Sequence, residues 1–193
     1  MVDGTPRGIS YSGKNIMEEK ELAEAWMSIT SQIISDYPSL SELVIVGIRS
    51  RGNILASRMV KEIKKATETN VPLGILDITL YRDDFTTVGP EPVVRETEID
   101  FDINGKNVIL VDDVLFTGRT IRAAMDALID FGRPASIRLA VLIDRGEREI
   151  PIQPDYVSKK IAVKPGEIVE VKLKELDGEE GIVVTKQKSS TPT

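Results

Sequence analysis

The stretch VILVDDVLFTGRT, residues 108–120, runs from apolar residues into two adjacent carboxylates and then into a polar turn. The apolar run before Asp112 is typical of a strand that is buried on both faces. Thr117 and Gly118 are typical of a tight turn. The stretch therefore predicts a buried strand, an acidic pair at its end, and a helix that begins near Thr120.

The segments on either side of this stretch repeat the alternation of strand and helix. Leu22, Trp26, Ile29 and Ile33 share one helical face, and short apolar runs mark further strands. This alternation indicates an α/β fold with a mostly parallel central sheet flanked by helices. The predicted helices span residues 15–37, 52–66 and 120–131, and the predicted strands span residues 43–48, 73–80, 108–111 and 137–143. Two further strands, residues 168–173 and 182–185, are predicted to form an added hairpin.

The length of 193 residues suits one domain. Residues 14–186 are predicted to form it, between a flexible N-terminus of residues 1–13 and a flexible tail of residues 187–193. Residues 81–101 contain Gly89, Pro90 and Pro92 and are too many for a simple connection. Irregular segments of this length are often lids over a binding site.

The composition excludes several kinds of chemistry. The chain has no cysteine and no histidine, which removes disulfides, thiolate metal sites and Ser-His-Asp triads. Its net charge of -6 argues against general nucleic-acid binding, although a local basic face remains compatible with that charge. Because no apolar run reaches the length of a membrane helix and no signal core is evident, we expect a cytoplasmic protein without membrane contact.

Three polar segments follow predicted strands, where parallel sheets bind their ligands. They are residues 49–52, 112–113 and 144–146. An isolated acidic pair is most simply a solvated strand end, with Thr117 as a helix N-cap. A receiver-domain phosphoacceptor site also has such a pair, but it follows the first strand and leaves the Thr-Gly-Arg-Thr turn without a role. A third interpretation uses every residue: the turn binds a phosphate through its backbone amides, and the carboxylates bind the vicinal hydroxyls of a ribose.

The same stretch resembles the phosphoribosyl-pyrophosphate (PRPP) binding motif of type I phosphoribosyltransferases. The segments LVIVGIRSRGNILA, DITLYRDDFTTVG, TGRTIRAAMDAL and DRGEREIPIQPDYVSKKI are together similar to the PyrR family. That resemblance covers roughly residues 15–185. It implies the type I phosphoribosyltransferase fold, with a lid loop over residues 81–101 and a C-terminal β hood. It also implies a uracil phosphoribosyltransferase that makes UMP and pyrophosphate from uracil and PRPP with Mg²⁺.

The resemblance also assigns roles to individual residues. It implies Asp112, Asp113 and Arg82 as catalytic residues, with the two acids holding the ribose diol and contacting the metal only indirectly. The implied PRPP and nucleotide contacts are Ser50, Arg51, Gly52, Asp112, Asp113, Val114, Leu115, Phe116, Thr117, Gly118, Arg119 and Thr120. The implied pyrophosphate loop is Arg49, Ser50, Arg51 and Gly52, and the implied base hood opens with Asp144, Arg145 and Gly146. Purine-type members often carry an acid where Phe116 stands, so Phe116 favours a pyrimidine.

A second activity is implied by the family: binding of pyr leader mRNA in response to UMP or UTP, by a homo-oligomer that is a dimer or larger. Arg148 and Lys159 are the candidate RNA contacts, within a wider basic set of Arg119, Arg122, Arg133, Arg138 and Lys160. Glu147 and Gln153 stand at variable positions where RNA-binding relatives tend to carry basic or histidine residues. The first hypothesis is the uracil phosphoribosyltransferase. The alternative is a nucleotide-sensing RNA-binding attenuator with little or no catalysis.

Overall fold

The computed structural model describes residues 13–83 and 96–186. Its central sheet has five parallel strands in the order β3-β2-β4-β5-β6. The bounds of these strands are β2 Leu43–Ile48, β3 Leu73–Leu76, β4 Asn107–Leu115, β5 Ser136–Asp144 and β6 Tyr156–Lys160. The predicted α/β class is confirmed, and the carboxyl ends of β2, β4 and β5 lie at one edge of the sheet.

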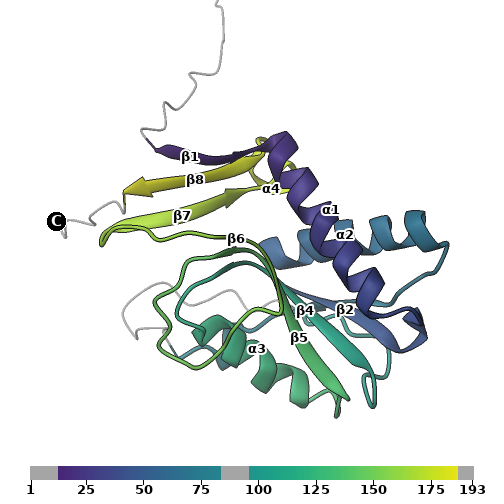
Figure 1. Ribbon diagram of the computed structural model, residues 1–193. Coiled ribbons are helices and arrows are strands. Elements are labelled where there is room, and N and C mark those ends of the chain that lie inside the picture. The colour runs from purple at the N-terminus through teal and green to yellow at the C-terminus, as the bar shows by residue number, and fades with distance from the viewer. Residues whose placement is uncertain (1–12, 84–95, 187–193) are drawn as a thin grey trace, which may run out of the picture.

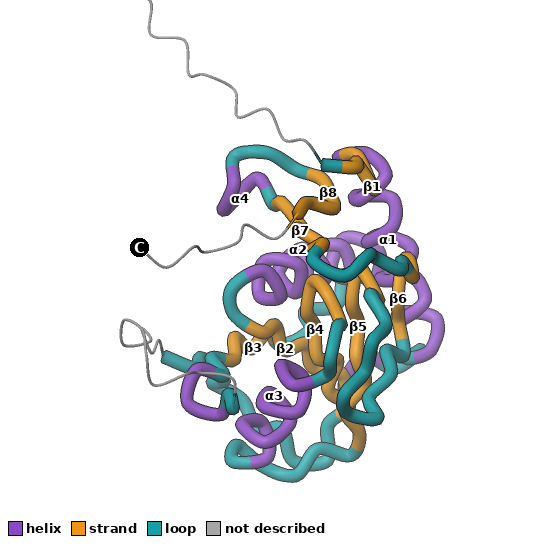
Figure 2. Tube along the Cα trace, turned by 90° about the vertical axis from the view of Figure 1, so that its left-hand side faces the viewer, coloured by secondary structure: helices purple, strands orange, loops and turns teal. Residues whose placement is uncertain are grey.

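Helices cover both faces of this sheet (Figures 1 and 2). Helices α1 (Glu19–Asp36) and α2 (Arg51–Thr67) pack on one face, against Ile109 and Val111 of β4. Helix α3 (Arg119–Ile129) packs on the other face, against Val108 and Leu110. Residues 108–111 of β4 alternate between the two cores, as the pleat of a strand requires, which explains why this part of the strand is apolar.

A second, antiparallel sheet of three strands lies beyond the carboxyl edge of the first (Figure 1). Its strands are β1 (Lys14–Glu18), β7 (Glu167–Lys172) and β8 (Gly181–Lys186), in the order β1-β8-β7. The short helix α4 (Lys174–Asp177) connects β7 to β8. The predicted hairpin is thus confirmed, and β1 extends it through pairing with β8.

The predicted helix over residues 15–37 is wrong at its start. Residues 14–18 form β1, in which Met17 is buried opposite Ile182. Helix α1 begins after Glu18, because the Glu18 side chain accepts a hydrogen bond from the backbone N–H of Glu21, and the Glu21 side chain accepts one from the Glu18 N–H at 2.9 Å. This reciprocal capping box satisfies two N–H groups that the first helical turn leaves without partners.

Several predicted boundaries also differ from the structure. Strand β4 continues through Leu115, so the acidic pair lies within the strand rather than after it. Strand β3 ends at Leu76, and the short 3-10 helix η2 (Thr79–Tyr81) follows it; another, η1 (Leu40–Glu42), precedes β2. Strand β6 and helix α4 were not predicted.

Most of the predicted lid and the predicted flexible ends lie outside the described residues, in the ranges 1–12, 84–95 and 187–193. None of the described helices is long and apolar enough to cross a membrane.

Candidate active site

The two carboxylates of the motif lie near the end of β4, one on each face of the sheet. Asp112 is only 7% exposed and follows the α3 side, whereas Asp113 follows the α2 side and is partly exposed. Each carboxylate accepts a hydrogen bond from the next backbone N–H, at 3.0 Å in both cases. Both nevertheless line one cavity of about 240 Å³ at the carboxyl edge of the sheet.

Burial raises the pKa of both carboxyl groups. For Asp112 the pKa is raised well above its ordinary value, first by loss of hydration and then by the neighbouring charge of Asp113, while the charge of Arg82 lowers it. For Asp113 loss of hydration again dominates and raises the pKa, while the hydrogen bond with Asp112 and the charge of Arg51 lower it. A cation or a hydroxyl donor bound to the pair would replace part of the lost hydration and favour the charged form of the carboxylates.

The predicted pyrophosphate loop lines the same cavity. Arg49, Ser50 and Arg51 connect β2 to α2 and face the carboxylates across it, and the peptide bond between Arg49 and Ser50 is cis. Gly52 is buried where α2 crosses β4. A Cβ atom at Gly52 would lie 2.4 Å from the carbonyl oxygen of Val111, so only glycine permits this approach.

The turn after β4 forms a second cavity of about 280 Å³. Gly118, with φ +94°, caps α3 in the left-handed conformation, which glycine adopts without strain. The hydroxyl oxygen of Thr117 accepts a hydrogen bond from the N–H of Arg119 at 3.4 Å, although Gly118 rather than Thr117 occupies the N-cap position. Residues 114–121 line this cavity together with Arg82. The helix N-terminus and its backbone amides thus face a space suited to a phosphate.

Arg82 lines both cavities, and so do Val114 and Thr120. The two spaces therefore adjoin at these residues, one of which is a cation. The side chain of Arg119 points elsewhere: its Nε donates to Glu149 at 2.6 Å and its Nη1 to Asp83 at 3.0 Å. Because its guanidinium is paired with these two carboxylates, Arg119 contributes to the phosphate-sized cavity mainly through its backbone N–H group.

Residues 144–146, which were predicted to open the base hood, pack against the turn that follows β4. Asp144, Arg145 and Gly146 do not line either of these two cavities. The Arg145 guanidinium stacks 3.8 Å from the centroid of the Phe116 ring, a cation–π contact. Asp144 is 5% exposed and accepts hydrogen bonds from the Gly146 N–H at 2.9 Å and from Nη2 of Arg148 at 2.6 Å.

Arg148, a predicted RNA contact, is partly buried and connects several loops. Its Nε donates to the carbonyl of Ile152 at 2.8 Å, and its Nη1 donates to the carbonyls of Phe116 at 2.8 Å and Gly146 at 3.0 Å. With the ion pair to Asp144, these contacts use four of the five N–H donors of the guanidinium. Arg148 thus fixes the turn against the hood, with 12% of its side chain exposed, and its role as an RNA contact stays a prediction.

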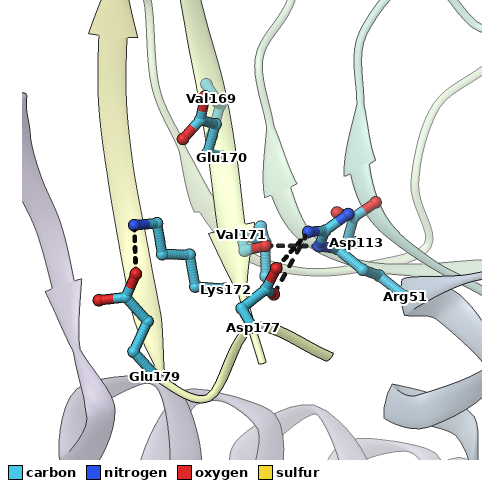
Figure 3. A pocket seen from close by; sticks show the side chains of 8 residues that line it. All are labelled: Arg51, Asp113, Val169, Glu170, Val171, Lys172, Asp177 and Glu179. Carbon is cyan, nitrogen blue, oxygen red and sulfur yellow. Dashed lines mark hydrogen bonds and ion pairs between the residues drawn. The ribbon is translucent and has the colours of Figure 1, made fainter. Parts of the chain in front are cut away.

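Sequence reasoning missed a third group of residues around the site. A cavity of about 430 Å³ lies between the two sheets, with Arg51 and Asp113 on one side (Figure 3). The other side consists of residues from β7, α4 and the turn that follows, namely Val169, Glu170, Val171, Lys172, Asp177 and Glu179. These residues lie more than a hundred positions from Arg51 in the sequence, and only their predicted hairpin gave a signal.

Comparison with known proteins agrees with this geometry. A family model described as "Phosphoribosyl transferase domain" matches residues 12–176. A "Bifunctional protein PyrR" from Pelotomaculum thermopropionicum is 52% identical over 169 residues, which cover 88% of this chain and 93% of the relative. A protein of the same name from Clostridioides difficile is 50% identical and covers 88% and 96% of the two chains.

The chain belongs to the PyrR family of phosphoribosyltransferases. A crystal structure of a hypoxanthine-guanine phosphoribosyltransferase from Bacillus anthracis is also similar, with a TM-score of 0.67 over 92% of this chain and 99% of that chain. At 20% identity this likeness shows the fold alone. The resemblance to the PyrR family that the sequence motifs indicated is therefore confirmed.

The remaining basic residues of this PyrR-family chain differ in their surroundings. Arg122 is paired with Asp83 at 3.5 Å, and Arg138 lies 4.0 Å from Asp155. Lys159 is exposed, and its Nζ donates to the carbonyl of Ile16 at 3.4 Å. A groove of about 650 Å³ between β6 and the small sheet contains Lys159 together with Lys14, Lys164 and Lys186.

Proposed function

We propose that this PyrR-family chain transfers the phosphoribosyl group of PRPP to uracil, releasing UMP and pyrophosphate. The observation that carries this proposal is the junction of two cavities beside the carboxylates. One cavity joins Asp112 and Asp113 to the Arg49–Arg51 loop, and the adjoining one is formed by the turn before α3. PRPP has three polar parts, and each would meet a different group of residues. The ribose hydroxyls would meet the carboxylates, the pyrophosphate would meet the arginine loop, and the 5-phosphate would meet the turn.

The chemistry follows from the charges of these walls. A nitrogen of uracil forms the new bond to the anomeric carbon as the bond to the pyrophosphate oxygen breaks, and the uracil proton passes to solvent or to the departing anion. Positive charge develops on the ribose ring, while negative charge accumulates on the pyrophosphate. The buried carboxylates lie beside the ribose, and the arginine loop lies beside the leaving group, so each stabilises the charge that grows next to it.

The carboxyl pair also fits Mg²⁺. Within residues 13–83 and 96–186, no cluster of three or more carboxylates is arranged to hold a metal ion by protein ligands alone. Mg²⁺ commonly keeps several waters and binds through one or two carboxylates together with substrate phosphates. We infer that Asp112 and Asp113 would hold the metal indirectly, through its waters, and that it would supply positive charge beside the pyrophosphate.

A base-selectivity assay tests this proposal. Phe116 is held under the Arg145 guanidinium and offers no acceptor to a purine ring nitrogen. We expect kcat/KM for uracil to exceed that for hypoxanthine at least about 100-fold. The reason is that a purine ring nitrogen would be buried at Phe116 without a hydrogen-bond acceptor. Each base would be supplied with PRPP and Mg²⁺, and nucleotide formation would be followed by chromatography. Equal rates with the two bases would contradict a pyrimidine-specific site.

A second function, regulation through pyr leader mRNA, is supported by a separate observation. Lys14, Lys159, Lys164 and Lys186 gather at one groove, whereas most arginines near the site are paired with carboxylates. Within residues 13–83 and 96–186 no carboxylate forms an ion pair with these lysines, although Glu167 also lines the groove. Lysines gathered at one groove attract the phosphate backbone of RNA even on a chain of net charge -6. The curated relatives are themselves called bifunctional.

Replacement of one groove lysine tests the RNA proposal. If Lys159 contacts a phosphate, Lys159→Ala should weaken binding to a pyr leader and reduce the slope of log affinity against log salt by about 1. The titration would be repeated with a scrambled RNA of equal length, and Lys20→Ala, on the exposed side of α1, serves as the matched control. An unchanged salt slope, or equal affinity for leader and scrambled RNA, would contradict this role.

A further inference from the structure

The guanidinium of Arg51 is tied to the small sheet. Its Nε donates to the carbonyl of Val171 at 2.6 Å, and its Nη2 donates to both carboxylate oxygens of Asp177, at 2.9 and 3.2 Å. Both side chains are only partly exposed, at 35% and 25%. Such a charge-assisted pair is stronger than a neutral hydrogen bond. Figure 3 shows this contact in the cavity between the two sheets.

The segment that carries Asp177 has a second, separate attachment to α2. Arg58 donates to Glu175 at 3.0 and 2.6 Å and to Glu180 at 2.5 and 3.2 Å. These bonds raise the pKa of Arg58 above its ordinary value. Helix α4 therefore remains attached to α2 through Arg58 when the contact between Arg51 and Asp177 is broken.

Arg51 lies at the boundary between two spaces. It lines the cavity that contains Asp112 and Asp113, and it also lines the cavity under β7 and α4. Its guanidinium lies beside Asp113 in Figure 3. A pyrophosphate in the loop of residues 49–52 would draw on the same N–H groups that now serve Asp177. A guanidinium has five donors in a fixed plane, and one edge cannot bind two anions at the same time.

We propose that Asp177 is an internal competitor for the pyrophosphate subsite, and that the pyrophosphoryl group of PRPP displaces it from Arg51. The inference rests on the proposed function, because it assumes that the loop of Arg51 receives pyrophosphate. The carboxylate neutralises Arg51 while the subsite is empty and returns when pyrophosphate leaves. Asp177 thereby weakens the binding of PRPP and of pyrophosphate, and it speeds release of the product.

The competition separates ligands that carry a pyrophosphoryl group from those that do not. UMP has a ribose and a 5-phosphate but no group for the loop of residues 49–52. It therefore leaves the contact between Arg51 and Asp177 in place, whereas PRPP breaks it. The state of α4 and β7 then differs between the substrate-bound and the product-bound chain.

Calorimetric titration of Asp177→Asn tests this inference with a readout that a purely structural role would not move. The variant keeps the shape of the side chain and removes its charge. We expect the Kd of Mg²⁺–PRPP, measured without uracil, to fall about two- to fivefold, the range for a partly exposed ion pair. The inhibition constant of pyrophosphate should fall by the same factor, while the Kd of UMP stays within error.

Every other pattern overturns the inference. Unchanged PRPP affinity means that Asp177 does not compete, weaker PRPP binding alone means that it positions Arg51 for the ligand, and weaker binding of both PRPP and UMP means a structural role. Glu175→Gln is the matched control, because it removes a carboxylate from the same helix that faces Arg58, and it should change neither Kd. Failure of the wild-type chain to bind PRPP or UMP would contradict the proposed function itself, a result distinct from all of these.

Discussion

UMP formation should fall by about 100-fold or more when the carboxyl pair is neutralised in Asp112→Asn/Asp113→Asn, because stabilisation of charge in the transition state is lost. Both side chains line the cavity that we assign to the ribose. The asparagines keep the size of the side chains but carry no charge, so they cannot offset positive charge on the ring or attract Mg²⁺ through its waters. Steady-state rates with saturating PRPP and uracil measure this effect on kcat.

The same variant should remain folded. Burial raises the pKa of both acids, so in the wild-type chain their contribution to stability is fully present below the unfolded pKa and is lost as pH rises through the folded pKa. Asparagine has no such loss. The double variant should therefore unfold at pH 8 at a temperature equal to or above that of the wild type, as followed by circular dichroism. A folded double variant with wild-type activity would contradict the role of the pair.

Gly52→Ala should disrupt stability and activity together. A Cβ atom there would lie 2.4 Å from the carbonyl oxygen of Val111 and 3.2 Å from Cα of Asp112, both backbone atoms that cannot rotate away. Helix α2 must move off β4, which should lower the free energy of unfolding by about 2–3 kcal/mol. The movement also shifts Arg51 relative to Asp113, so kcat/KM for PRPP should fall even at temperatures where the variant stays folded.

Gly105→Ala is the control for this substitution. Gly105 has φ +69°, but among the described residues no heavy atom lies within 4 Å of a Cβ added there. Only the backbone strain applies, so the unfolding free energy should fall by about 1 kcal/mol with unchanged kcat/KM. Urea unfolding of both variants measures the comparison. Equal effects of the two alanines would contradict the account of close packing between α2 and β4.

The parts of the fold that the sequence predicted are those with strong periodicity. The apolar runs of β2, β4 and β5 and the helical face of Leu22, Trp26, Ile29 and Ile33 all correspond to buried residues. The errors fall where a local pattern competes with pairing between distant segments. Residues 14–18 continue the helix by composition, yet they pair with β8, more than 150 positions away in the sequence. Strand β6 has exposed lysines at its end, and only its pairing with β5 identifies it.

The candidate site divides in the same way. The residues of the motif, Asp112, Asp113 and the turn before α3, lie together because one strand and one turn place them there. Their roles stay predictions. The sequence could not show that Arg148 is enclosed by carbonyls, or that Arg51 meets Asp177, because those contacts depend on how separate loops pack. A charged residue in a sequence motif indicates which kind of ligand it can bind, but the sequence does not show which residue it pairs with in the fold.

The most direct test of the central claim is the formation of UMP by the wild-type chain from uracil, PRPP and Mg²⁺. The account predicts that UMP and pyrophosphate appear in equal amounts, that both depend on uracil, and that chelation of the metal abolishes the reaction. Binding of PRPP or UMP without any formation of UMP would contradict it. The cavity beside the carboxylates would then serve to sense nucleotides for RNA regulation rather than to catalyse the transfer.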